Sequence, residues 1–464
     1  MLLSQTTTAA VKSSPILDKK IEESTAGLSA SFVKSLYSIS VEDAATIVEY
    51  IAAMKSEVNL SDHYRKDLIE LLSKFSKYHD SRPFKDLTRK DILEFLGSFR
   101  KTETQDPLHK WIGTYNTYRM HLLRFFKWFY YPDIEPRKRP KPPVIENIAQ
   151  LKRKEKSIYK PSDLWTQQDD LLFLKYCPSK RDKCYHAISR DLSARPHEIL
   201  KLKIKDIAFK VISTYQYVDV VVNGKTGTRP IPLINSIPYL KDYLDHEHPQ
   251  PRNPNAPLIC GVGRGLGRHI KPTRIGYIYN EYKMHIFPKL LESPDVLPED
   301  KQRIMELLKK PWNPYIRRHS ALTEKSTILK EHVLRQHAGW SGSSQMHLKY
   351  LHYFGNESNE SLLEAYGIVA KGQQFDQLKP KQCPNCSEPN KPDSKFCAKC
   401  RMVLTYDAYS ETLENQQVKE KELQSVKERM SNIENLLVTI QPVLQNIKPE
   451  MLSKLQIVES NQQL

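Results

Sequence analysis

Apolar residues recur at helical spacing early in the chain, as in LSDHYRKDLIELLSKFSKYH and TYNTYRMHLLRFFKWFYY. This period predicts amphipathic helices that each bury one face. Asp86 and Thr88 stand at the starts of predicted helices, and Pro132 closes the last one. We expect a compact bundle of about four helices over 28–132. The preceding segment, 1–27, is rich in Ser, Thr, Ala and Lys, and it is predicted to be a mostly disordered arm.

A mixed pattern of helical and β-rich stretches occupies 161–370. It opens with helical spacing and continues as VISTYQYVDVVVNGKTGTRPIPL, in which two β-rich runs flank an Asn-Gly turn. Two such runs around a short turn predict an antiparallel hairpin. Helical spacing then returns. The predicted fold is therefore mainly α with a small antiparallel β-sheet.

The C-terminal segment, 410–464, is predicted to be a charged helix. Six apolar residues alternate at spacings of 3 and 4 until Pro442 intervenes. This pattern is a heptad seam of under three heptads, which is short for a coiled coil. It either docks on the parent domain or joins subunits. The six residues are Leu423, Val426, Met430, Ile433, Leu437 and Ile440.

The composition indicates a class of binding partner and a cellular compartment. A chain of 464 residues is too long for one hydrophobic core, so several domains are expected. The 71 basic and 54 acidic residues leave a net charge of +17, which favours a polyanionic partner. No apolar run approaches the roughly 18 residues of a membrane span, and the N-terminus lacks an apolar stretch of signal-peptide length. We expect a soluble cytoplasmic protein without a membrane partner.

The segment over 133–160 combines prolines with a high density of basic residues. Its prolines forbid a continuous helix, so a charged, extended linker between two domains is predicted. Such a linker either lies along a phosphate backbone or is only a solvated spacer. The residues placed to make the phosphate contacts are Lys152, Arg153, Lys154 and Lys156.

A four-cysteine module over 380–403 contains CPNCSEPNKPDSKFCAKC (383–400), which has the spacing CxxC-x10-CxxC. Each CxxC turn presents two thiolates to one ion, and the intervening loop returns the second pair to complete a tetrahedron. The alternative is a set of disulfides or a redox dithiol. Because all four positions would be taken, the predicted zinc ion is structural. Its ligands would be Cys383, Cys386, Cys397 and Cys400.

Five motifs occur in the order and rough spacing of the tyrosine recombinase or phage integrase family, which the chain resembles. They are LSARPHEILKLKIKDI (192–207), VVNGKTGTRPIPL (221–233), PYIRRHSALT (314–323), HAGWS (337–341) and MHLKYLHYF (346–354). The module order with a trailing zinc ribbon is most similar to archaeal integrase-type members.

The resemblance implies a helical, SAM-like core-binding domain over 28–132 and a catalytic domain over 161–370. Its partner would be double-stranded DNA, on which the chain would self-associate to a tetramer on paired sites. The implied activity is site-specific recombination, in which DNA is cleaved and rejoined through a 3′-phosphotyrosyl intermediate without a cofactor. Two alternatives stay open: a type IB topoisomerase-like enzyme, and a DNA-binding protein that has the integrase fold but no cleavage activity.

Attack on a phosphodiester needs cations on the non-bridging oxygens and a proton donor for the leaving oxygen. Arg195 and Arg318 match the two arginines of the family, although Arg317 stands next to the second. Lys225, at the predicted hairpin tip, matches the proton donor. Each of these residues could instead be an ordinary surface cation.

Tyr350 heads Tyr-Leu-His ten residues after Trp340 and matches the nucleophile, while Tyr353 is assigned to packing. Trp340 would donate its indole N–H to the phosphate, and its alternative role is core packing. Tyr315 stands where the family usually has a histidine. A phenol, with a reference pKa of about 10, is a poor base near neutrality. Base duty would then pass to water or to another group, and His319 packs or hydrogen-bonds behind Arg318.

Overall fold

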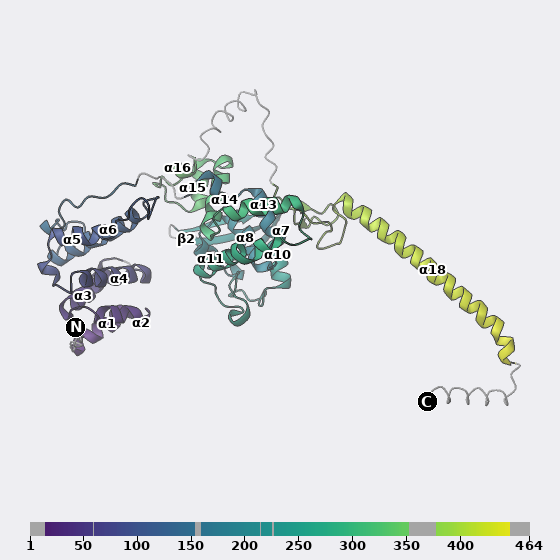
Figure 1. Cartoon of the computed structure of the whole chain (residues 1–464), viewed down its shortest axis with the longest axis horizontal. Helices are drawn as coiled ribbons and strands as arrows, with labels where there is room; N and C mark the ends of the chain where they lie inside the picture. Colours follow the sequence, from purple (N-terminus) through teal and green to yellow (C-terminus); the bar gives the residue numbers. More distant parts are fainter. Residues whose placement is uncertain are drawn as a thin grey trace, which may run out of the picture. The chain divides into compact units, whose positions relative to one another are not determined.

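The described residues of the chain are mainly helical, with two small antiparallel sheets (Figure 1). This confirms the predicted fold class. The structure is a computed structural model. The chain divides into two compact units, residues 1–158 and 159–464. No described helix is long and apolar enough to cross a membrane. The described ranges are 14–58, 60–153, 159–213, 215–224, 227–351 and 377–445.

The first unit is a helical bundle whose core is aromatic. Phe75, Phe95 and Phe125 are fully buried, and Phe75 meets Phe95 edge to face at 4.9 Å. The Thr88 side chain and the Asp91 carboxylate form a reciprocal capping box at the start of α5, which confirms the helix start predicted at Thr88. The start predicted at Asp86 is wrong, because Asp86 is the last residue of the short helix η1. The elements are α1 (Pro15–Thr25), α2 (Ala30–Tyr37), α3 (Val41–Glu57), α4 (Asp62–Tyr78), η1 (Phe84–Asp86), α5 (Arg89–Gly97), α6 (Trp111–Tyr130) and η2 (Pro143–Ile145).

Helix α1 lies within the segment that was expected to be a disordered arm, and that expectation is wrong for its residues. Ser14 caps the helix, and Leu17 and Ile21 are buried in the core of the bundle. Because these two residues are four positions apart, they lie on one face of the helix, and both pack against the core of the bundle. The segment is rich in polar residues, which hid this short stripe from a composition-based prediction. Residues 1–13 lie outside the described ranges.

Much of the proline-rich linker packs on the first unit. Ile145 and Ile148 are buried in its core, and the Arg119 side chain donates to the Ile148 carbonyl at 2.7 Å. Arg139 is buried and forms an ion pair with Glu57. This part of the linker is therefore not a free spacer, and the short 3₁₀ helix η2 is the one helical element among its described residues.

The second unit surrounds a three-stranded sheet with helices. Its elements are η3 (Pro161–Asp163), α7 (Gln167–Tyr176), α8 (Lys180–Leu192), α9 (Pro196–Leu200), η4 (Ile204–Asp206), β1 (Ile207–Ile212), β2 (Tyr215–Gly224), β3 (Gly227–Leu233), α10 (Ile237–His246), η5 (Gly263–Gly265), α11 (Pro272–Glu281), η6 (Tyr282–Ile286), α12 (Phe287–Leu290), α13 (Pro298–Lys309), α14 (Pro314–Ile328), α15 (Glu331–Ala338), α16 (Leu348–Leu351), β4 (Lys381–Gln382), β5 (Pro389–Asn390) and α18 (Tyr406–Gln445).

The predicted hairpin is present as β2 and β3, which pair antiparallel up to Gly224 opposite Gly227. The predicted position of its turn is wrong, because the Asn-Gly pair (223–224) lies within β2. The first β-rich run, however, forms two strands rather than one, because the chain turns at Ser213 with a φ of 56°. Strand β1 then pairs antiparallel with β2, so the sheet order is β1-β2-β3. Val218, Val220 and Val222 are buried, and they place one face of β2 in the core of the unit.

Candidate active site and metal site

Helix α14 holds two adjacent arginines in different surroundings. The Asn313 side chain caps the helix by accepting from two backbone N–H groups at 3.0 Å. Arg317 is fully buried, and its Nη1 lies 2.5 Å from Asp170 Oδ1. Arg318 donates instead to the carbonyls of Ser193 at 2.5 Å and Ala338 at 2.8 Å. Successive residues of a helix point about 100° apart, so only one of the pair can face the core salt bridge.

Arg318 lies in a cationic environment. Burial and the neighbouring Arg195 lower its pKa to about 10, and the nearby Tyr350 and Glu198 oppose that shift. Its two terminal nitrogens each use one hydrogen on a backbone carbonyl and keep another. Two guanidinium groups held close together at a partly closed surface form a natural position for an anion.

Arg195 caps α9 and is held by Glu198, one turn later. Its backbone N–H donates to one Glu198 oxygen at 3.0 Å, and its guanidinium donates to the other at 2.8 Å. Glu198 also accepts from Arg229 Nη2 at 2.9 Å. Burial opposes the charge of Glu198, yet the Arg195 N–H and the Arg229 guanidinium together hold its pKa below the ordinary value. Glu198 therefore fixes Arg195 in direction.

Arg229, on β3, completes this network and was missed by the sequence prediction. It is buried, and its Nε donates to the His337 carbonyl at 3.0 Å. Gly339 has a φ of 64°, and a Cβ added there would lie 2.5 Å from Arg229 Nη1. Gly339 is thus required both for its backbone conformation and for the space that Arg229 occupies. The signal lay in the motifs that contain both residues, but no spacing rule identifies such a pair.

Tyr350, on α16, is 2% exposed and lies against two other rings. Its ring stacks on Trp340 with centroids 5.4 Å apart and on His319 with centroids 5.8 Å apart. Its hydroxyl forms a hydrogen bond of 3.1 Å with His319 Nδ1. Sequence reasoning placed His319 behind Arg318, whereas the structure places it in contact with the predicted nucleophile.

The structure thus brings together four of the predicted site residues, namely Arg195, Arg318, Trp340 and Tyr350. Tyr315 lies in the first turn of α14 and is 48% exposed. Two predicted residues, Lys225 and the packing residue Tyr353, lie outside the described ranges. Among the linker cations, Lys152 is exposed and Arg153 is half-buried. The remaining two, Lys154 and Lys156, are also outside the described ranges.

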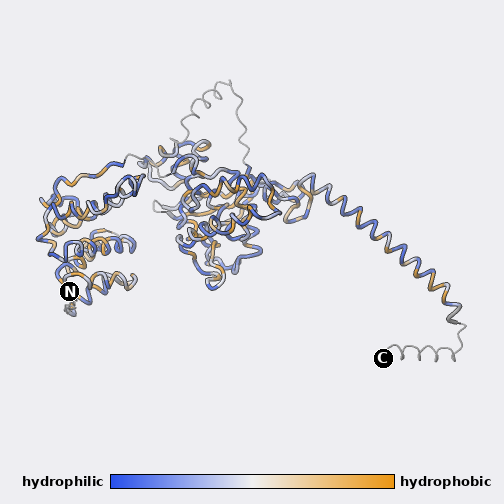
Figure 2. The backbone as a smooth tube through the Cα atoms, viewed as in Figure 1, coloured by the Kyte–Doolittle hydropathy of each residue, from blue (hydrophilic) through white to orange (hydrophobic). Residues whose placement is uncertain are grey.

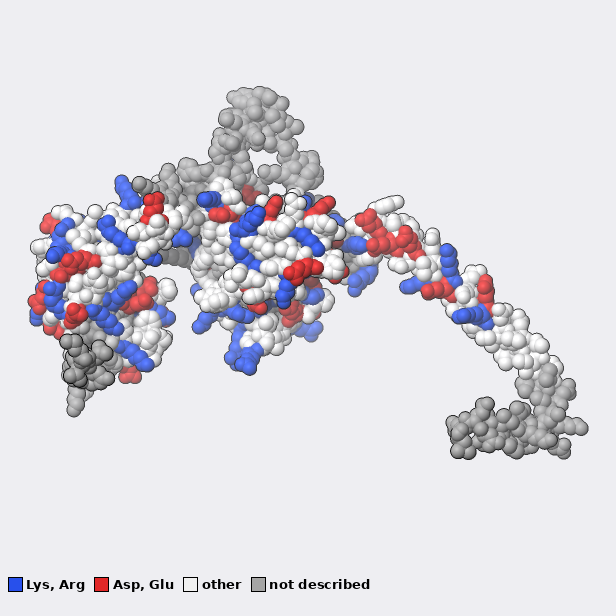
Figure 3. Space-filling view, in the orientation of Figure 1, with Lys and Arg blue, Asp and Glu red and all other residues white. Residues whose placement is uncertain are grey.

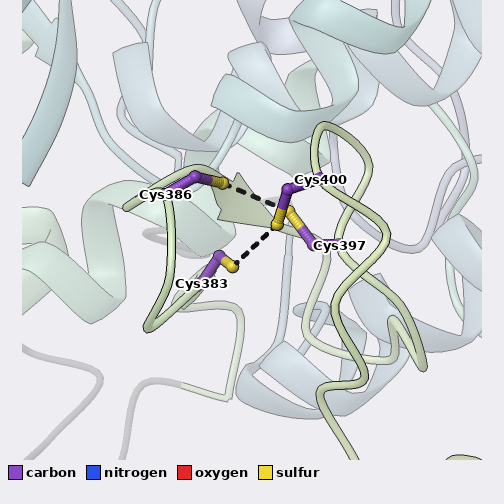
Figure 4. A group of neighbouring side chains, drawn as sticks. All are labelled: Cys383, Cys386, Cys397 and Cys400. Atoms are coloured by element: carbon purple, nitrogen blue, oxygen red, sulfur yellow. Dashed lines mark hydrogen bonds between the residues drawn. The ribbon is translucent and has the colours of Figure 1, made fainter.

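The four cysteines of the C-terminal module converge on one point (Figure 4). Their sulfur atoms all lie within 4.8 Å of one another. Two sulfur pairs, Cys383 with Cys400 and Cys386 with Cys397, are 3.5 and 3.6 Å apart. These distances exceed the roughly 2.05 Å of a disulfide. They approach the roughly 3.8 Å edge of a tetrahedron with metal–sulfur bonds of about 2.3 Å, so the residues fit a tetrathiolate metal ion such as Zn²⁺.

Salt bridges anchor this module to α10. Lys391 lies 2.5 Å from Asp242, and Lys241 pairs with Glu388. A cavity of about 670 Å³ opens between the two elements, and it is lined partly by Phe209. This cavity contains none of the predicted active-site residues, so it forms no part of the candidate active site.

Comparisons with known proteins add a likeness in fold. No family model and no curated protein matches the chain. A XerH site-specific recombinase in a post-cleavage complex with its palindromic difH substrate has a TM-score of 0.45 and 17% identity. That match covers 76% of this chain and 95% of the other.

Two further solved structures are similar to the chain. The Tn1549 transposon integrase in complex with transposon right end DNA has a TM-score of 0.45 and 14% identity, over 69% of this chain and 99% of that one. A lambda integrase dimer bound to a COC′ core site has a TM-score of 0.45 and 11% identity, over 67% and 77%.

Proposed function

We propose that the chain is a site-specific DNA recombinase of the integrase type, which cleaves and rejoins DNA through a 3′-phosphotyrosyl intermediate. One observation carries the proposal. Arg195, Arg318, Trp340 and Tyr350 come from four separate sequence motifs; Arg195 and Tyr350 both lie close enough to Arg318 to affect its pKa, and Trp340 stacks on the Tyr350 ring. Packing alone gives no reason for two guanidinium groups to approach each other beside that phenol.

In the proposed reaction, Tyr350 Oη attacks phosphorus and the bond to the 5′ oxygen breaks. Arg195 and Arg318 hold the non-bridging oxygens, on which negative charge grows in the transition state. Lys225 protonates the leaving 5′ oxygen. Trp340 and Tyr315 add hydrogen bonds to the phosphate. The phosphotyrosyl link keeps the energy of the broken bond, so attack by a 5′ hydroxyl rejoins the strand without external energy.

The other parts of the chain receive roles in the same proposal. The bundle over 28–132 and the basic linker would hold the duplex beside the catalytic domain over 161–370. The four-cysteine module would bind a structural zinc ion, which takes no part in the reaction. Exchange between two duplexes requires several protomers, so the proposal includes a tetramer on paired sites.

A nicked suicide duplex tests the nucleophile. Wild-type protein should form a covalent adduct, which is trapped when the short fragment that carries the released 5′ hydroxyl diffuses away. Tyr350→Phe keeps the ring and its stacking but lacks the attacking oxygen, so it should bind DNA normally and form no adduct. Tyr353→Phe is the matched control and should keep most adduct formation. Peptide mapping that finds the nucleotide on any residue other than Tyr350 would contradict the assignment.

A second candidate function is DNA binding without cleavage. It is favoured by the burial of Tyr350 and by the presence of Tyr315 where the family usually has a histidine. The same assay separates the candidates, because a non-cleaving protein shifts the duplex but yields no adduct with wild-type protein. Joining of two different duplexes then distinguishes a recombinase from a type IB topoisomerase-like enzyme.

A further inference from the structure

His319 lies one helical turn after the position from which the family's histidine is missing. Tyr315 and His319 both belong to α14 and are four residues apart, so they share a face of the helix. The Tyr315 residue is 48% exposed, whereas the His319 ring lies between neighbours. One neighbour is Tyr350, and another is Tyr159, whose ring centroid is 5.1 Å away. The imidazole is therefore held in place by rings on the described part of the unit.

We propose that His319 is the catalytic base that accepts the phenol proton of Tyr350. The inference rests on the proposed function and names the group that activates its nucleophile. It follows from the hydrogen bond of 3.1 Å between Tyr350 Oη and His319 Nδ1, because a base must lie within about 2.6–3.2 Å of the proton it removes. An imidazole, with a reference pKa of about 6.5, accepts a proton near neutrality far better than a second phenol does.

Both protons that move in the cleavage step have a donor and an acceptor. The proposed step uses the tautomer of His319 that carries its hydrogen on Nε2, so that Nδ1 offers a lone pair to the phenol. As the bond from Tyr350 Oη to phosphorus forms, the phenol proton moves to Nδ1. The bond from phosphorus to the 5′ oxygen breaks, and that oxygen takes a proton from Lys225. Religation reverses both transfers.

Two variants of His319 separate a base from a positioning residue. His319→Gln keeps a side-chain oxygen that can accept the Tyr350 hydrogen bond, but it cannot take the proton. If His319 is the base, adduct formation on the nicked duplex should fall by about 10²–10⁴-fold in this variant. His319→Ala should show a similar loss, and added imidazole should restore part of its rate. DNA binding, followed by fluorescence anisotropy, should stay near wild type for His319→Gln.

A substrate with sulfur in place of the bridging 5′ oxygen provides the matched control. A thiolate leaves without needing a proton, so this substrate should restore the rate of Lys225→Ala, which lacks the acid. It should leave His319→Gln slow, because the phenol must still lose its proton.

The outcomes distinguish the inference from the function on which it rests. Near wild-type cleavage by His319→Gln, or rescue of that variant by the sulfur substrate, would overturn the role of His319 while leaving Tyr350 as nucleophile. If wild-type protein forms no adduct with either substrate, the proposed function itself fails.

A separate observation concerns α18, whose apolar seam faces solvent. The six seam residues are 44–60% exposed. Hydrophilic and hydrophobic residues alternate along this helix (Figure 2), and its charged residues of both signs give way to uncharged ones toward its end (Figure 3). The seam residues at heptad positions a and d are Leu423, Val426, Met430, Ile433, Leu437 and Ile440.

We infer that α18 pairs in parallel with α18 of a second copy of this chain. With Leu423 at position a, the flanking g positions are Glu422 and Arg429, and the e positions are Lys427 and Glu434. In a parallel pair, each g residue meets the e residue five positions later on the partner helix. Glu422 would meet Lys427, and Arg429 would meet Glu434, so both contacts between charged residues join opposite charges, whereas the third, Leu436 with Gln441, is uncharged. An antiparallel pair would also join Lys427 to Glu434, but it would place Arg429 beside Leu436, so it would form fewer contacts between opposite charges than the parallel pair.

Charge reversal in the full chain tests both the partner and the orientation. Arg429→Glu and Glu434→Arg each create like-charged contacts in a parallel homodimer, so each should raise the dimer dissociation constant by about tenfold. A mixture of the two variants restores opposite charges and should dimerise like wild type. Sedimentation equilibrium measures all three samples. A monomeric wild-type chain, or an Arg429→Glu variant that dimerises as wild type does, would overturn the inference.

Discussion

Replacing Arg317 by alanine should destabilise the second unit by about 3–5 kcal/mol, because it removes one partner of a buried ion pair. Its partner, Asp170, is fully buried and also accepts from Arg190 at 2.5 Å and from His186 at 3.0 Å. Burial opposes the charge of Asp170, yet Arg317, followed by Arg190, holds its pKa below the usual range. Arg317 also lies over the Trp165 ring at 5.2 Å, so alanine leaves a cavity as well.

We attribute this loss of stability to the lost charge attraction between Arg317 and Asp170. The contact from Arg317 Nη1 to Asp170 is an ion pair by its distance of 2.5 Å, although no Arg317 nitrogen has the geometry of a hydrogen bond. Because the pKa of Asp170 is depressed in the folded state, its contribution is fully present above the ordinary carboxyl range. That contribution is lost only as pH falls through the depressed value. Unfolding by urea near pH 7 therefore measures the whole effect.

The adjacent arginine should behave differently. Arg318→Ala leaves the carbonyls of Ser193 and Ala338 without this donor, at a cost of about 1–3 kcal/mol, so the protein should still fold. Its adduct formation should fall by about 10²–10³-fold, the usual cost of one lost oxyanion donor. An Arg317→Ala protein of unchanged stability that binds DNA but does not cleave would refute this reasoning, since Arg317 would then be the phosphate ligand.

Three further predictions concern other parts of the chain. The cysteine module should bind one equivalent of zinc by elemental analysis, and Cys397→Ser should release it and unfold the module; a metal-free protein with four disulfide-bonded thiols would contradict this. Gly339→Ala should displace Arg229 from Glu198 and so lower both the melting temperature and the cleavage rate. An unchanged cleavage rate would show that the contact between Arg229 and Glu198 does not contribute to cleavage. DNA binding should weaken with salt, with a slope of log K against log salt of about −0.9 per neutralised phosphate. Neutralising four linker cations together should flatten this slope, and an unchanged slope would mean that the linker is only a spacer. The four residues are Lys152, Arg153, Lys154 and Lys156.

Local patterns in the sequence were sufficient for the features that depend on neighbouring residues. The capping box at Thr88 and the hairpin of β2 and β3 follow from residues within a few positions of one another. The gathering of four thiols follows from two CxxC turns, each of which directs both of its side chains to one side. Helix periodicity and turn preference act over one or two turns of chain, so their signals survive in the sequence alone.

Tertiary structure decided what depends on residues far apart in the chain. The resemblance favours Arg318 over the adjacent Arg317 as a phosphate ligand, but only the position of Asp170 on α7 shows that Arg317 is a core residue. His319 meets Tyr350 because α14 and α16 pack together, which no spacing within either motif predicts. A side chain's role depends on what lies across the contact, and that partner is chosen by packing of whole elements rather than by local periodicity.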